Sequence, residues 1–131
     1  MQKLTVNPNT LIFREEMQNR VDEVAARFAD GNYPAITAVD NLILDGHNRA
    51  KVAIDNDDVI TVVNLTQSEY DYLSDLGYDD MEISYAALTA AGEIDAAMAY
   101  IDQFAGSSIF ERGEEAYIKL LAMIGRTDID I

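Results

Sequence analysis

The sequence predicts an α+β fold, with a small mixed β-sheet in its first half and helices in its second. Three observations support this prediction. Strand-like and helix-like patterns alternate over residues 1–66, only helical patterns follow over residues 67–131, and 131 residues is the usual length of one domain. We therefore expect residues 1–66 to form an α/β core, and residues 67–131 to form an acidic helical extension packed on it as one compact unit.

The first half has the order strand, helix, strand, strand, helix, strand. The predicted strands cover residues 3–6, 35–39, 42–44 and 59–63, and the predicted helices cover residues 17–28 and 46–56. Arg27 lies on the face of the first helix that is left to water. Gly31 then supplies the left-handed conformation of a helix stop. Only Asp40 and Asn41 separate the second and third strands, which is typical of a tight hairpin.

The second half contains patterns for about three helices. Thr66 and Glu69 have the spacing of a capping box, in which each satisfies a backbone group of the other. A long helical pattern follows over residues 82–104, with Gly92 as a candidate break. A similar capping-box spacing at residue 108 begins the last helix. No strand pattern occurs in this half, so the sheet is expected to come from the first half alone.

The composition is that of a soluble globular protein. Apolar residues make up 49% of the chain, and no apolar run approaches the roughly 18 residues that span a bilayer. Asn7 and Pro8 interrupt the N-terminus before the core of a signal peptide could form. We therefore expect a cytoplasmic protein. Because the chain has no cysteine, it has no disulfide, no thiolate zinc site and no thiol nucleophile.

The chain is strongly acidic, with 24 Asp and Glu against 9 Lys and Arg and a net charge of −15. Nucleic-acid-binding proteins neutralise several phosphates with basic side chains, and anionic membranes attract basic segments. This charge therefore argues against generic DNA or RNA binding, against a nuclease and against membrane docking. Two interpretations of the excess of acidic side chains remain open. They form a well-solvated surface, or they form an acidic face that binds a basic partner or imitates a phosphate backbone.

Residues 45–49 combine the features of an anion site, because they follow an apolar strand and begin a helix. The first turn of a helix has unpaired N–H groups, and the helix dipole adds partial positive charge there. Gly46 has no Cβ, which would let a phosphate approach the backbone. Arg49 offers a planar fork of donors to phosphate oxygens. The pattern indicates a phosphate site, although a glycine before a helix is also an ordinary cap.

Each residue of this segment has an expected role. Gly46, His47, Asn48 and Arg49 are the candidate residues that bind the phosphates of a cofactor. Asp45 and His47 are the candidate catalytic residues, because a carboxylate can accept a proton and an imidazole can donate one. Asp45 is also the candidate ligand of a metal ion. The alternative for a single histidine is simple packing or exposure at the surface.

This segment is the last of three motifs in a fixed order. Asn7-Pro8 comes first, Gly31-Asn32-Tyr33-Pro34 follows the first helix, and residues 45–50 follow the predicted hairpin. In this order the motifs resemble the ParB/sulfiredoxin-like superfamily, whose members show an Asn-Pro start, a Gly-x-x-Pro and, in one branch, an Asp-Gly-His-x-Arg motif. The resemblance covers about residues 3–65 and implies the β-α-β-β-α-β core of that superfamily.

Members of the superfamily bind nucleotide phosphates with this motif. They include partition proteins that bind CTP, a sulfinic acid reductase that uses ATP, and kinases of free serine. The resemblance therefore implies a nucleoside triphosphate, ATP or CTP, with Mg²⁺ as the cofactor, and an ATPase or a small-molecule phosphotransferase as the activity. Two departures from the motifs of the superfamily narrow the activities that the resemblance implies. The chain lacks the cysteine of the reductase, and it lacks the second phosphate motif and the helix-turn-helix of the partition proteins.

Three charged residues outside the motif have two interpretations each. Glu15 and Glu16 either complement the dipole of the first helix or hold the amine of a substrate, as a kinase-like member could. Arg112 lies beside a predicted helix start and either joins a phosphate site or is an ordinary surface residue.

The sequence thus leaves two functions open. The first is a nucleotide-binding domain that uses residues 45–49. The second is a non-enzymatic acidic interaction protein, such as an inhibitor or DNA mimic from a phage or mobile element, that binds a basic protein partner. The second is favoured by the charge of residues 67–131, which carry 14 acidic and 3 basic side chains.

Overall fold

The computed structural model describes residues 1–13, 21–103 and 109–128, and its fold is mixed α+β, as predicted. Its elements are β1 (Gln2–Val6), the 3-10 helix η1 (Pro8–Thr10), α1 (Val21–Arg27), β2 (Ile36–Val39), β3 (Leu42–Asp45), α2 (His47–Asp55), β4 (Ile60–Leu65), α3 (Gln67–Asp75), α4 (Asp80–Ala90), α5 (Ile94–Gln103) and α6 (Ile109–Asp128). Within the described ranges, no helix is long and apolar enough to cross a membrane.

The four strands form one mixed sheet in the order β1-β4-β2-β3. β1 is antiparallel to β4 and β3 is antiparallel to β2, whereas β2 and β4 run parallel. The predicted hairpin between β2 and β3 is confirmed, with Asp40 and Asn41 both at positive φ, 45° and 72°. Both residue types tolerate this left-handed conformation, which a two-residue hairpin turn requires. α2 then connects β3 to β4.

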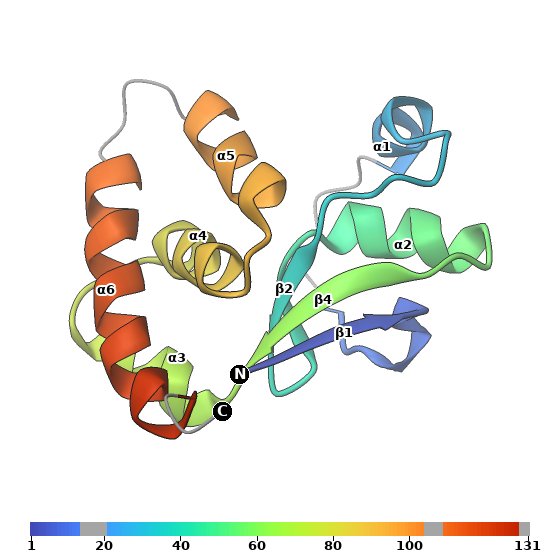
Figure 1. Cartoon of the computed structure of the whole chain (residues 1–131). Helices are drawn as coiled ribbons and strands as arrows, with labels where there is room; N and C mark the ends of the chain where they lie inside the picture. The colour runs from blue at the N-terminus through green and yellow to red at the C-terminus, as the bar shows by residue number, and fades with distance from the viewer. Residues whose placement is uncertain (14–20, 104–108, 129–131) are drawn as a thin grey trace.

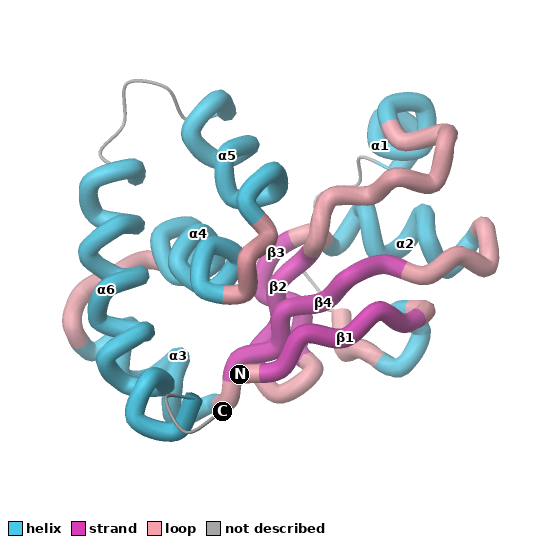
Figure 2. Tube along the Cα trace, viewed as in Figure 1, coloured by secondary structure: helices cyan, strands magenta, loops and turns pink. Residues whose placement is uncertain are grey.

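Helices cover both faces of the sheet, so the molecule has three layers. α1 and α2 lie on one side of the strands, and α3 to α6 lie on the other (Figures 1 and 2). The alternation along β2 explains this arrangement, because successive side chains of a strand point to opposite faces. Ile36 and Ala38 belong to the core beneath α2, whereas Ala35 and Val39 belong to the core beneath α4.

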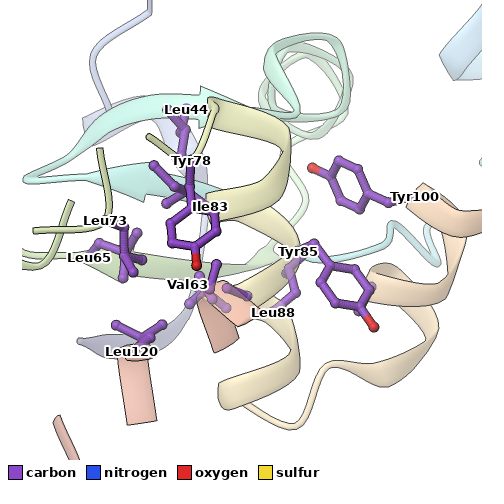
Figure 3. Close-up of a cluster of buried hydrophobic side chains, with 14 of the residues drawn as sticks. Leu44, Val63, Leu65, Leu73, Tyr78, Ile83, Tyr85, Leu88, Tyr100 and Leu120 are labelled. Atoms are coloured by element: carbon purple, nitrogen blue, oxygen red, sulfur yellow. The ribbon is translucent and has the colours of Figure 1, made fainter. Parts of the chain in front are cut away.

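The larger core joins the sheet to the second half of the chain. Val63 and Leu65 of β4 pack in one buried cluster with Leu73 of α3 and Leu120 of α6 (Figure 3). A polar contact crosses the same layer. Thr37 of β2 and Ser84 of α4 are both fully buried, and their hydroxyl oxygens lie 2.8 Å apart.

The second half contains four described helices rather than about three. The predicted capping box of α3 is confirmed, because the Thr66 hydroxyl accepts from the Glu69 amide and the Glu69 carboxylate accepts from the Thr66 amide. The helical pattern over residues 82–104 divides at Gly92, which has a φ of 79°. α4 begins two residues earlier than expected, at a capping box formed by Asp79 and Glu82. Position 108, where the last helix was expected to begin, lies outside the described residues.

Candidate functional site

All five residues from Asp45 to Arg49 line one cavity of about 350 Å³. The cavity lies where β3 passes into α2. The end of α1 forms part of its wall, and side chains of α4 and α5 complete it from the other side of the sheet. The site therefore combines residues from both halves of the chain.

Gly46 determines how α2 begins. It is the N-cap residue of the helix, has a φ of 102°, and its carbonyl accepts a hydrogen bond from the Ala50 amide. A Cβ at this position would lie 2.2 Å from Cγ2 of Ile36. The sequence allows two reasons for this glycine, the approach of a phosphate and an ordinary helix cap. The structure confirms the cap and adds a third reason, because the side on which a Cβ would project is already filled by Ile36, and the positive φ also favours glycine.

Arg49 lies along the wall of the cavity and is held there by its own chain. Its Nη1 donates to the carbonyl oxygens of Pro34 and Ala35, each at 3.2 Å. Its Nη2 lies 3.7 Å from Oδ2 of Asp45, and the side chain is 18% exposed. A guanidinium has five N–H donors, so these two hydrogen bonds leave the donors of Nε and Nη2 for other partners.

Asp45 is joined to the second half of the chain through Tyr100 of α5. The Tyr100 hydroxyl donates a hydrogen bond to Oδ2 of Asp45. Tyr100 is 5% exposed and also lines the cavity. Burial raises the pKa of the Tyr100 hydroxyl, and the negative charge of Asp45 raises it further. The hydroxyl therefore stays protonated and remains a hydrogen-bond donor at physiological pH.

His47 and Asn48 also lie in the cavity wall. The ring of His47 packs against Phe13, with ring centroids 6.3 Å apart and an angle of 59° between the planes. The Nε2 atom of His47 is buried. The structure thus places His47 both in the cavity wall and in a packing contact with Phe13, whereas the sequence presents a site role and simple packing as alternatives.

Arg27 is a second cation at the cavity, and the sequence does not predict it there. It lies in the last turn of α1, is exposed to solvent as the helical pattern predicts, and lines the cavity. Among the described residues that line the cavity, the charges of Arg27 and Arg49 together outweigh the carboxylate charge of Asp45. In a chain with a net charge of −15, the cavity therefore has a locally positive wall.

A second cavity of about 500 Å³ adjoins the first. Residues 32–35 form one side and residues 92–96 form the other, and Pro34 and Ala96 line both cavities. This cavity is larger, but its charged side chains are the carboxylates of Glu93 and Asp95. The smaller cavity carries the positive groups and is therefore the better candidate for binding an anion.

Arg112, the one remaining candidate that the structure describes, does not line the cavity. Arg112 lies on α6, where its Nε is 2.6 Å from a carboxylate oxygen of Glu82 and its Nη2 donates to the carbonyl of Gly77. The guanidinium also stacks 5.1 Å from the ring centroid of Tyr78. These contacts give Arg112 a structural role between helices. Glu15 and Glu16 lie outside the described residues.

No preformed metal centre is present among the residues that the structure describes. No group of three or more His, Cys, Asp or Glu side chains there could hold a metal ion. Asp45 would therefore be the one carboxylate that the described part of the cavity wall offers to a metal ion. Magnesium sites that include a nucleotide need only one or two carboxylates, because phosphate oxygens and waters supply the other ligands.

The contact between Gly46 and Ile36 predicts a large loss of stability in the variant Gly46→Ala. The strain of a positive φ and the clash with Ile36 together should lower the free energy of unfolding by about 2–4 kcal/mol. Gly77→Ala is the matched control, because Gly77 has a φ of 94° but nothing lies within 4 Å of its Cβ position. Only the backbone strain applies there, about 1–2 kcal/mol.

Urea unfolding followed by circular dichroism measures both losses. A larger loss for Gly46→Ala than for Gly77→Ala is expected. Equal losses would show that close packing on Ile36 does not determine the start of α2.

Comparisons with known proteins identify no relative of this chain. No protein-family model, no curated protein and no solved structure matches it. The motifs at residues 3–65 are therefore the basis for any proposed kinship, and the function has to be argued from the cavity itself.

Proposed function

We propose that this chain is a nucleotide-binding domain of the ParB/sulfiredoxin-like type, which holds the phosphates of ATP or CTP at the start of α2. One observation carries the proposal. The five residues in which the sequence predicts a phosphate site, residues 45–49, all line a single cavity, and a second arginine, Arg27, lines it with them.

The charges in the cavity wall support an anionic ligand. The N-terminal turn of α2 adds the partial positive charge of a helix dipole to the two guanidinium groups. Arg49 is held by the carbonyls of Pro34 and Ala35, so little side-chain freedom is lost when it binds a phosphate. Mg²⁺ would be held by Asp45 together with phosphate oxygens.

The sizes of the two cavities support a ligand larger than a phosphate ion. Sites for small molecules usually have volumes of about 300–1,000 Å³. The first cavity, at about 350 Å³, is at the lower end of this range and suits the phosphate chain. The adjoining cavity of about 500 Å³ leaves space for the sugar and base. Its carboxylates, Glu93 and Asp95, are acceptors for hydroxyl or amino groups.

Turnover is the second step of the proposal. Asp45 is 29% exposed and lies in the wall beside Arg49; as the alternative to holding Mg²⁺, it can accept a proton from water or from a small hydroxyl substrate. His47 is the candidate donor to the transferred phosphate. We place this ATPase or phosphotransferase activity in the cytoplasm, where nucleoside triphosphates are available.

Isothermal titration calorimetry with ATP, ADP and CTP, each with Mg²⁺, tests the proposal. We expect binding of at least one nucleotide at a single site. Arg27→Gln should raise the dissociation constant at least about tenfold, because a hydrogen bond to a charged group contributes about 1.5–3 kcal/mol.

Lys51→Gln is the control variant for this experiment. Lys51 lies on α2, is 48% exposed and pairs with Asp55 at 3.7 Å, and it does not line the cavity. Its loss should leave the dissociation constant unchanged. Absence of heat from every nucleotide with folded protein would contradict the proposal, and so would equal effects of the two substitutions.

A second candidate function is supported by the surface of α3. Tyr72 of α3 and Leu76, the C-cap residue of that helix, are large apolar residues that are 39% and 47% exposed. Their spacing of four residues places them on the same side of the helix end. Asp71 and Asp75 are exposed beside them. We propose as the alternative that this acidic and apolar face binds a basic protein, without catalysis.

Affinity capture from lysate at low and high salt tests this alternative. A basic partner should be retained at about 50 mM salt and released at about 1 M, where the screening length falls to roughly 3 Å. The double variant Tyr72→Ser, Leu76→Ser should retain less of it, since the apolar contacts are lost. If wild-type protein retains nothing at low salt, the alternative is wrong.

A further inference from the structure

Tyr100 lies in the helical second half of the chain and is not among the residues that the sequence predicts for the site, yet it contacts the candidate site directly. It is 5% exposed, lines the 350 Å³ cavity, and donates its hydroxyl hydrogen to Oδ2 of Asp45. The two residues are separated by 55 positions in the chain. A buried hydroxyl is costly unless it finds a partner, so this contact fixes the position of both side chains.

The same carboxylate oxygen faces the arginine of the site. Oδ2 of Asp45 lies 3.7 Å from Nη2 of Arg49, while Nη1 of Arg49 donates to the carbonyls of Pro34 and Ala35. Asp45 therefore stands between Tyr100 and Arg49. If the carboxylate turned away, Arg49 would keep its backbone partners but lose the charge that orients Nη2.

We propose that Tyr100 is a positioning residue of the phosphate site: its hydroxyl fixes the Asp45 carboxylate, and that carboxylate orients the guanidinium of Arg49 toward the phosphates of the ligand. The inference rests on the proposed nucleotide site and adds to it that the helical half of the chain completes the site. α5 supplies a group that holds the binding residues in place without itself touching the phosphates.

Tyr85 of α4 provides a matched comparison within the same core. It is 3% exposed, and its hydroxyl donates to Oε1 of Glu114 at 2.6 Å. Figure 3 shows the hydroxyls of Tyr85 and Tyr100 pointing to opposite sides. Tyr85 does not line the cavity. The substitutions Tyr85→Phe and Tyr100→Phe thus each remove one hydroxyl that donates to a carboxylate. Only Tyr100→Phe removes a hydroxyl that contacts a residue of the candidate site.

The test measures two properties of the wild-type protein and both variants. The first is the dissociation constant for ATP with Mg²⁺, by calorimetry. The second is the side-chain Nε–H signal of Arg49 in the ligand-free protein, by ¹H–¹⁵N NMR, which reports the orientation of the guanidinium without any ligand. Asp45→Asn serves as a second variant if Tyr100→Phe does not fold, since it removes the carboxylate through which Tyr100 is proposed to orient Arg49.

We expect Tyr100→Phe to raise the dissociation constant about tenfold and to shift or broaden the Arg49 signal, while Tyr85→Phe changes neither. If wild-type protein binds ATP and Tyr100→Phe binds it equally well, the inference is overturned. If wild-type protein binds no nucleotide, the proposed function fails, and the Arg49 signal alone decides the inference. A change specific to Tyr100→Phe then supports the positioning role, and an unchanged signal overturns it.

Discussion

The close contact between Gly46 and Ile36 fixes the point at which β3 ends and α2 begins. A residue with a Cβ would both clash with Ile36 and strain the backbone at a φ of 102°. This contact determines the direction of α2, and with it the positions of His47, Asn48 and Arg49 in the cavity wall. The geometry of the candidate site is therefore a consequence of packing in the core beneath α2.

Polar contacts across the sheet then unite this corner with the second half of the chain. Thr37 of β2 and Ser84 of α4 share a buried hydrogen bond, and the Tyr100 hydroxyl of α5 donates to Asp45 at the end of β3. Buried polar groups are strongly position-specific, because each needs a partner in one geometry. The helical half of the chain thus contacts the candidate site through Tyr100 of α5.

The features that the sequence predicts correctly are set by local interactions. Asp40 and Asn41 form the hairpin turn, and Thr66 with Glu69 forms the capping box, because each depends only on residues a few positions away. The division of the helical pattern at Gly92 is also local, because it depends on the positive φ of that one residue.

The features that the sequence does not predict depend on contacts between distant residues. No periodicity in α5 distinguishes Tyr100, which reaches Asp45, from an ordinary core tyrosine. Arg27 has the spacing of a solvent-facing residue, and only the placement of α1 beside α2 brings it to the cavity. The packing of Gly46 against Ile36 also cannot be predicted from local sequence, because Ile36 lies ten residues earlier and on another element.

Chemical-shift mapping by ¹H–¹⁵N NMR during titration with ATP and Mg²⁺ tests the central claim most directly, since it locates a bound phosphate chain without relying on any substitution. The account predicts that the largest shifts fall on the backbone amides of residues 46–50 and on the side chain of Arg27. Shifts confined to α3 and α6, or no shifts at saturating nucleotide, would contradict it.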